Sequence, residues 1–172
     1  MDEVHFVVGD LNLESKDNQD AVIEMLAQNE EAIGRLYIAY SERFPSFKDL
    51  WLVLASEEKE HAAWIRKLGE QTRDGRVLFT PDRFRRAAIR SFQNYIEKEI
   101  VAAKGAGLQI INALSIAFYI EESLIERKYF EVFETDSVEL KRLLRDLDAA
   151  TRKHAQTIRA VWDQHRLDTG TH

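Results

Sequence analysis

Two side chains that could bind a metal lie three residues apart in the stretch from Trp51 to Leu68. Glu58 and His61 share one helical stripe with apolar or small residues, so both point from the same helix face into the same space. The other members of the stripe are Trp51, Leu54, Ala55, Ala62, Ile65 and Leu68. A buried carboxylate and imidazole are costly unless their charge and hydrogen bonds are compensated. A metal cation, an arginine or a water would each do so, and this pair alone leaves the choice open.

Three further stretches with a helical repeat each place a carboxylate or an imidazole in the middle of an apolar stripe. These residues are Glu30, Glu121 and His154, with Glu31 and Glu122 as alternatives if the register differs by one residue. A single such residue usually snorkels or pairs with another group. Four helices that each offer one indicate a bound cation. Iron and manganese accept mixed carboxylate and imidazole ligands, whereas zinc prefers smaller sets rich in nitrogen and sulfur.

Five helical segments are expected to position these residues. They cover about residues 18–43, 46–69, 80–103, 108–134 and 138–170. Pro45 ends the first segment, and Ser46, with Asp49 three residues later, is expected to cap the second. Thr80 and Pro81 provide a cap and a proline at the first helical position of the third.

The order of these segments predicts an all-α bundle. Four of the helices are long, and a longer link joins the second and third long ones, which is typical of a bundle with one crossover connection. The last helix follows a turn and cap at residues 135–137. Residues 1–17 alternate briefly between apolar and polar and then turn polar, so we expect an N-terminal arm, followed by a bundle domain over residues 18–168.

Composition excludes several classes of function. The 172 residues suffice for one domain with a sizeable core, and the formal charge of −6 argues against a nucleic-acid partner. The chain has no cysteine, which excludes disulfides and cysteine-ligated iron–sulfur sites. The smoothest apolar run, residues 105–120, is too short and too striped to span a bilayer, and the N-terminus does not resemble a signal peptide. These features predict a soluble, cytoplasmic protein without a membrane partner.

The candidate metal residues together resemble those of rubrerythrin-type di-iron proteins in the ferritin-like superfamily, over about residues 20–165. That class takes a Glu from each of two helices and a Glu-x-x-His motif from each of the other two. Glu58-x-x-His61, followed by Ala62, is the most specific match, and Tyr37 follows the first-helix Glu by seven residues, as is common in the family. The resemblance implies the metal ligands Glu30, Glu58, His61, Glu121 and His154.

This sequence departs from the family pattern at two positions. Thr151 stands three residues before His154, where the family has a Glu that normally bridges two metals. Leu124 stands where rubrerythrins proper have a second Glu on the third helix of the site. Asp148, one turn before Thr151, is an alternative source of the missing carboxylate. The cysteine-rich rubredoxin module is also absent from this chain.

The resemblance implies a ferritin-like four-helix bundle whose long crossover contains an additional helix. It also implies a non-haem iron centre of one or two ions, with manganese or zinc as alternatives, that reduces peroxide or dioxygen. Electrons would come from an external donor protein, and the chain would form a homodimer or a higher homo-oligomer. The alternatives are an iron-handling ferroxidase or metal carrier, and a helical interaction module whose metal site has partly decayed.

Overall fold

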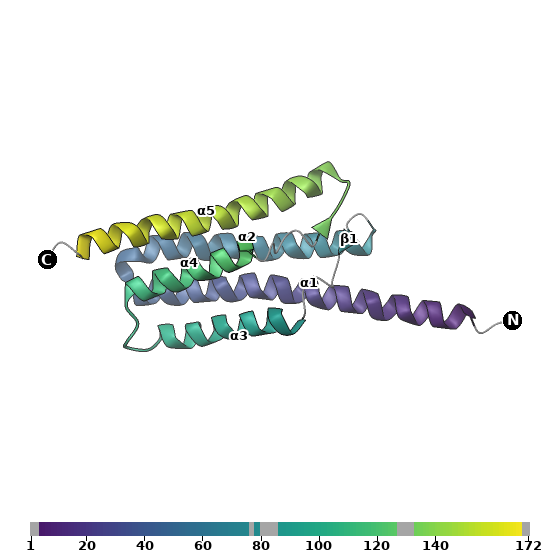
Figure 1. Ribbon diagram of the computed structural model, residues 1–172, viewed down its shortest axis with the longest axis horizontal. Helices are drawn as coiled ribbons and strands as arrows, with labels where there is room; N and C mark the ends of the chain where they lie inside the picture. The colour runs from purple at the N-terminus through teal and green to yellow at the C-terminus, as the bar shows by residue number, and fades with distance from the viewer. Residues whose placement is uncertain (1–3, 76–77, 80–85, 127–132, 170–172) are drawn as a thin grey trace.

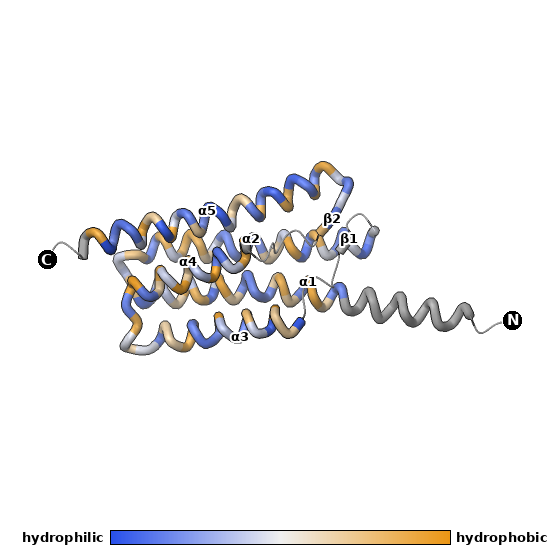
Figure 2. Tube along the Cα trace, in the orientation of Figure 1, coloured by the Kyte–Doolittle hydropathy of each residue, from blue (hydrophilic) through white to orange (hydrophobic). Residues whose placement is uncertain are grey.

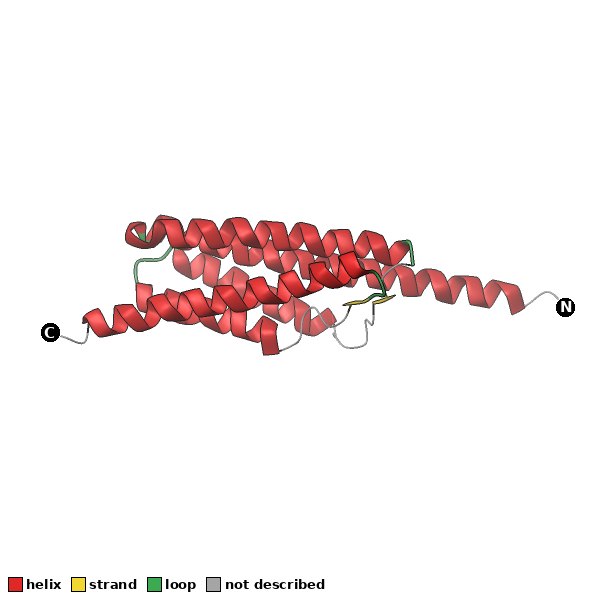
Figure 3. Ribbon diagram, turned by 90° about the horizontal axis from the view of Figure 1, so that it is seen from above, coloured by secondary structure: helices red, strands yellow, loops and turns green. Residues whose placement is uncertain are grey.

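The computed structural model describes residues 4–75, 78–79, 86–126 and 133–169, with side chains for residues 19–75, 86–125 and 133–167. Almost all of these residues are helical, and the helices run along the long axis of the molecule (Figure 1 and Figure 3). The elements are α1 (Val4–Arg43), the 3₁₀-helix η1 (Pro45–Phe47), α2 (Lys48–Arg73), β1 (Leu78–Phe79), α3 (Arg86–Ala103), α4 (Ile110–Glu126), β2 (Phe133–Glu134) and α5 (Val138–Thr169). The predicted all-α bundle is confirmed.

The helices pack as two pairs with an additional helix at one side. Helix α1 lies along α2 and also along α3, whereas α4 lies along α5, and α2 meets α5 (Figure 1). Helices α1, α2, α4 and α5 form the bundle, and α3 occurs in the long connection from α2 to α4. The predicted crossover with an additional helix is therefore present. Within the described residues, no helix combines the length and apolar character that a membrane span requires.

Apolar stripes on the helices form a continuous core. Figure 2 shows hydrophobic and hydrophilic turns alternating along the tube, as expected for helices with one buried face. The whole stripe predicted between Trp51 and Leu68 is buried. Trp51 lies at the centre of an aromatic cluster, with ring centroids 5.5 Å from Tyr37 and 5.0 Å from Tyr40. Such rings bury large apolar areas and prefer tilted contacts of this kind.

The beginnings of the first two helices differ from the prediction. Helix α1 starts at Val4 rather than near Asn18, and its N-terminal part extends beyond the end of α2 (Figure 1 and Figure 3). A long helix that is stabilised by packing at one end can propagate through polar residues that contain no proline. Ser46 does not cap α2, because Pro45 begins a 3₁₀ turn that contains Ser46, and Phe47 occupies the N-cap without a side-chain hydrogen bond.

The segment between α4 and α5 also differs. The predicted helix to Glu134 is wrong at its end, since α4 is described to Glu126 and Phe133–Glu134 forms a strand that pairs antiparallel with Leu78–Phe79. Burial of Phe133 stabilises this two-stranded ribbon, as aromatic residues favour strands. The cap predicted within residues 135–137 is confirmed and is Ser137, whose Oγ accepts a hydrogen bond from the Leu140 amide at 3.4 Å. The predicted start of the third helix at residues 80–81 lies outside the described residues.

Candidate metal centre

The five side chains predicted as metal ligands meet in the middle of the bundle. Glu30 comes from α1, Glu58 and His61 from α2, Glu121 from α4 and His154 from α5, and each is at most 2% exposed. Each belongs to the buried stripe of its helix, so the same packing that buries the apolar neighbours carries these ionisable groups inward. Three carboxylates and two imidazoles thus lie in a poorly solvated interior.

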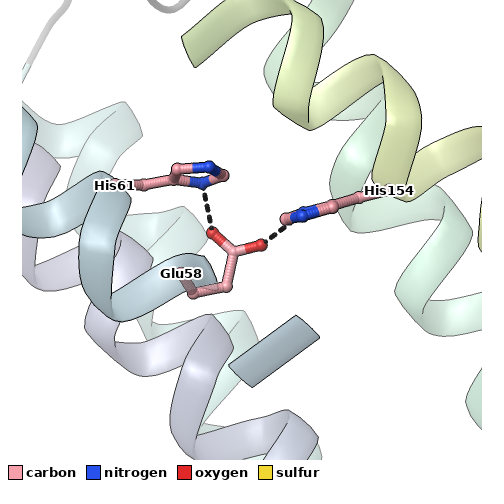
Figure 4. Close-up of side chains that lie close together, drawn as sticks. All are labelled: Glu58, His61 and His154. Atoms are coloured by element: carbon pink, nitrogen blue, oxygen red, sulfur yellow. Dashed lines mark hydrogen bonds and ion pairs between the residues drawn. The ribbon is translucent and has the colours of Figure 1, made fainter. Parts of the chain in front are cut away.

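Glu58 links the two imidazoles (Figure 4). Its Oε2 lies 3.0 Å from His61 Nδ1, and its Oε1 lies 2.8 Å from His154 Nδ1. One ligand atom from each of these three residues falls within 4.8 Å of the other two, which is close enough to share a single cation. The imidazole rings of His61 and His154 are stacked, with centroids 5.2 Å apart.

Glu121 approaches the same space from α4 and is held by a tyrosine. The Tyr37 hydroxyl donates a hydrogen bond to Glu121 Oε1 at 2.5 Å, and that oxygen lies 3.7 Å from His154 Nδ1. Glu121 Oε2 is buried and has no hydrogen-bond partner in the described part of the chain. Burial, followed by the charge of Glu121, raises the pKa of Tyr37 well above its ordinary value, so this hydroxyl remains a donor.

Glu30 is the least compensated of the carboxylates. Both of its oxygens are buried, and neither has a hydrogen-bond partner among the described residues. Burial and the charge of Glu58 raise the pKa of Glu30 well above its ordinary value. The pKa of Glu58 is also raised, first by burial and then by the charge of Glu121. Without a cation, the cluster therefore retains protons that isolated carboxylates would lose.

The two histidines respond to the cluster in opposite ways. Burial lowers the pKa of His61. Burial also disfavours the charged form of His154, but the carboxylates of Glu121 and Glu58 outweigh it and raise the pKa of His154 to about 11. In the metal-free protein, His154 is therefore the positive group that compensates the carboxylates at neutral pH. A bound cation would take over this role.

The neighbouring carboxylates considered as alternatives either pair with an arginine or are more exposed than the cluster residues. Glu31 accepts a hydrogen bond from Arg66 at 2.6 Å at the partly exposed side of α1. Asp148 pairs with Arg152 on α5 at 2.8 Å, away from the cluster. Glu122 is only half-buried, whereas Glu121 is 1% exposed. The helix registers thus direct Glu30 and Glu121, rather than these neighbours, to the cluster.

Thr151 is buried, but it does not replace a carboxylate. Its hydroxyl donates a hydrogen bond to the Leu147 carbonyl of the preceding turn at 3.1 Å. This back-bonding is common for threonine within a helix and turns the hydroxyl hydrogen toward its own backbone. Helix α5 therefore contributes His154 without an acidic residue three positions earlier on the same helix, whereas α2 places Glu58 three positions before His61.

Glu57, which the sequence pattern did not indicate, contacts the cluster from the solvent side. Glu57 Oε2 lies 2.6 Å from His154 Nε2, and the other oxygen lies 3.5 Å from Lys153 Nζ. Burial alone would raise the pKa of Glu57, but the hydrogen bond and charge of His154 outweigh it and lower the pKa. The sequence signal was its position next to Glu58, which places it one step around α2 toward α5.

These residues fit a metal cation. Three carboxylate oxygens, two on Glu30 and one on Glu121, are buried without a donor in the described chain, and unpaired buried acceptors are costly. A cation would compensate them together with Glu58 and the imidazoles. The donor set consists of carboxylate oxygens and imidazole nitrogens, which suits iron or manganese.

A helical bundle with a carboxylate–imidazole cluster at its centre is characteristic of ferritin-like proteins. The family model described as Rubrerythrin matches residues 21–162, which is most of the chain. The chain belongs to the rubrerythrin family. No curated protein and no solved structure matches it in the corresponding searches.

Proposed function

We propose that this protein is a non-haem iron oxidoreductase that reduces hydrogen peroxide or dioxygen, with electrons supplied by a separate donor protein. The observation that carries the proposal is the convergence of Glu30, Glu58 and Glu121 on two imidazoles, with several buried oxygens lacking a donor in the described chain. Membership of the rubrerythrin family supports the choice of iron and of this reaction class.

In this proposal Glu58, His61 and His154 would hold the principal cation, because their ligand atoms already lie within 4.8 Å of one another. Glu30 and Glu121 would complement its charge from the opposite helices. Iron, when bound, supplies the change of oxidation state that the reduction requires. Tyr37 orients Glu121 through its hydrogen bond, and the aromatic rings packed around Tyr37 exclude bulk water from the carboxylates.

We further propose that the centre is asymmetric, with about one tightly bound ion per chain and a second that is weak or labile. Three carboxylates offset more than the charge of one divalent cation but less than that of two, and excess charge is costly in a poorly solvated interior. Thr151 contributes no carboxylate at the position where the family places its bridging ligand. The missing carboxylate should lower the affinity for the second ion more than the affinity for the first.

The test begins with the metal content of the purified protein and an anaerobic titration with ferrous iron. We expect iron to bind and to be oxidised by peroxide or dioxygen faster than free ferrous iron, in stopped-flow spectra. An external reductant should be needed for further turnovers. His61→Ala should abolish binding or weaken it sharply, because His61 and Glu58 form the best-matched pair.

Other outcomes would point to the alternative functions. Tight iron binding without accelerated oxidation would favour a metal carrier, and accelerated oxidation by dioxygen with release of ferric iron would favour a ferroxidase. Absence of metal binding in the wild-type protein would contradict the proposal and favour an interaction module. Unchanged binding in His61→Ala would place the site elsewhere.

A further inference from the structure

A surface pocket between α2 and α5 ends at the carboxylate–imidazole cluster. Its volume is about 320 Å³ and its walls are mainly apolar. Its lining includes Leu50 and Val53 on α2 and, at the inner end, Glu57, Lys153 and His154. His154 is only 1% exposed, yet its ring forms part of the wall. The imidazole therefore stands between solvent in the pocket and the buried carboxylates.

The two nitrogens of His154 face different surroundings. Nδ1 lies 2.8 Å from Oε1 of Glu58 inside the cluster, and Nε2 lies 2.6 Å from Oε2 of Glu57 on the pocket side. Two carboxylates from adjacent positions on α2 thus hold one ring of α5. Lys153 contacts Oε1 of Glu57, the oxygen that His154 does not use, at 3.5 Å and fixes the carboxylate from the α5 side.

A neutral imidazole has one N–H group and one lone pair, so the nitrogen that keeps the proton determines which nitrogen can bind a metal. A carboxylate beside one nitrogen favours the proton there and leaves the other nitrogen free to ligate. Metal-ligating histidines usually donate their second N–H in this way, which also fixes the orientation of the ring.

We propose that Glu57 is a positioning residue of the metal centre, which holds the proton of His154 on Nε2 and directs Nδ1 to the cation. The proposal rests on the metal-binding function proposed above. Glu57 itself is about one-third exposed at its side chain and lies on the pocket side of the ring, so it acts through His154 rather than as a ligand within the buried cluster.

The test compares cobalt(II) binding by the full chain, measured by competition with a chromophoric chelator, in wild type, Glu57→Ala, Glu57→Gln and Glu60→Ala. Glu60 is an exposed carboxylate on the same helix and provides the matched control. Loss of an outer partner of a ligating histidine typically costs about 10–100-fold in metal affinity, which we expect for Glu57→Ala. Glu57→Gln should retain most of the affinity, because its amide oxygen still accepts the Nε2–H bond.

A second measurement separates positioning from a general effect on folding or charge. In zinc-loaded protein labelled with ¹⁵N-histidine, the wild-type His154 should carry its proton on Nε2. This signal should persist in Glu57→Gln and shift or broaden by exchange in Glu57→Ala. The melting temperature of each metal-free variant checks that the fold is intact. If Glu57→Ala does not fold, the cobalt(II) affinity and the His154 signal are compared between wild type and Glu57→Gln.

The proposal would be overturned if Glu57→Ala kept the wild-type cobalt(II) affinity and an unchanged His154 signal. It would also be overturned if Glu57→Ala and Glu60→Ala lost the same amount of affinity. A third contradicting result would be equal losses of affinity in Glu57→Ala and Glu57→Gln. The last result would assign the effect to charge alone. If wild-type protein binds neither cobalt nor iron, the proposed function fails together with this inference. If wild type binds the metal and Glu57→Ala binds equally well, the inference alone fails.

Discussion

The α1–α2 half of the cluster and its α4–α5 half differ in how completely they are built. In α2, Glu58 and His61 are three residues apart and contact each other at 3.0 Å. In α5, the corresponding positions hold Thr151 and His154, and the threonine hydroxyl bonds back to its own helix. His154 takes its carboxylate contacts from other helices instead, through Glu57, Glu58 and Glu121.

One half thus supplies its carboxylate–imidazole pair from a single helix, whereas the other depends on contacts between helices. A pair within one helix is maintained wherever the helix forms, because its spacing is set by the helical repeat. The contacts of His154 exist only when α5 lies against α2 and α4. We therefore expect the tight cation to be bound by the Glu58–His61 pair of α2 together with His154, and the carboxylate missing on α5 to weaken a second ion.

The largest expected effect is that of Glu58→Ala. Glu58 contacts both imidazoles, so its removal should weaken ferrous iron or cobalt(II) binding by more than the roughly 10–100-fold that is typical for outer partners. Competition titration against a chelator measures the change. Glu121→Ala should cost less, because Glu121 belongs to the incomplete half. A greater loss in Glu121→Ala than in Glu58→Ala would reverse the comparison.

Thr151→Glu should complete the α4–α5 half. The new carboxylate would restore the Glu-x-x-His motif and raise tight binding from about one ion per chain towards about two, as in carboxylate-bridged pairs. The metal-free variant should be less stable than wild type, since it buries a further ionisable group. Thr151→Gln is the control, because glutamine has the shape of glutamate without its charge. It should leave the number of tightly bound ions per chain unchanged. Two equally tight sites in wild type would contradict the proposed asymmetry.

A smaller effect is expected from Tyr37→Phe. Loss of the hydroxyl leaves another oxygen of Glu121 without its donor, which should lower the free energy of unfolding of the metal-free protein by about 1–3 kcal/mol. Urea denaturation measures this change. Tyr40→Phe is a matched control, because the buried Tyr40 hydroxyl has no partner among the described residues and its removal should be close to neutral. Equal losses in both variants would indicate a packing effect instead.

The most gradual of the expected effects is the change in the free energy of unfolding of the metal-free protein with each pH unit. The folded pKa of His154 is about 11, above the ordinary value of 6.5, so its contribution is complete below pH 6.5 and is lost as the pH rises through the folded pKa. The raised pKa values of Glu30 and Glu58 act in the same direction. The free energy of unfolding should therefore decrease from pH 7 to pH 10, by at most about 1.4 kcal/mol per pH unit for one proton.

This pH dependence can be assigned to its source with variants. His154→Gln should flatten the decrease, whereas His165→Gln on the same helix should leave it unchanged. Denaturant titrations at several pH values provide the measurement. A metal-loaded sample should behave in the opposite way, since the cation binds deprotonated ligands and its affinity increases with pH. A stability that increases from pH 7 to pH 10 in the metal-free protein would contradict the proton assignment.

Local spacing along the chain was enough to predict the helices that carry the candidate site and the inward face of each. Glu30, Glu58, His61, Glu121 and His154 occupy the central positions of stripes that the 3.6-residue repeat makes visible. Burial of these stripes followed in the structure because an apolar face must pack against another element. The absence of a carboxylate at Thr151 was equally visible, because the expected spacing from His154 is local.

Other details depend on neighbouring helices and could not be predicted from local spacing. The choice of Glu30 over Glu31 depends on how α1 packs: Glu30 is buried, whereas Glu31 lies where Arg66 of α2 reaches it, and no local pattern contains that contact. The strand at Phe133–Glu134 requires a partner more than 50 residues earlier in the chain. Glu57 acquires its role in the same way, because it meets His154 only where α2 packs against α5. Helical spacing is a local property of the sequence, whereas the partner across a helix interface depends on the packing of the whole bundle.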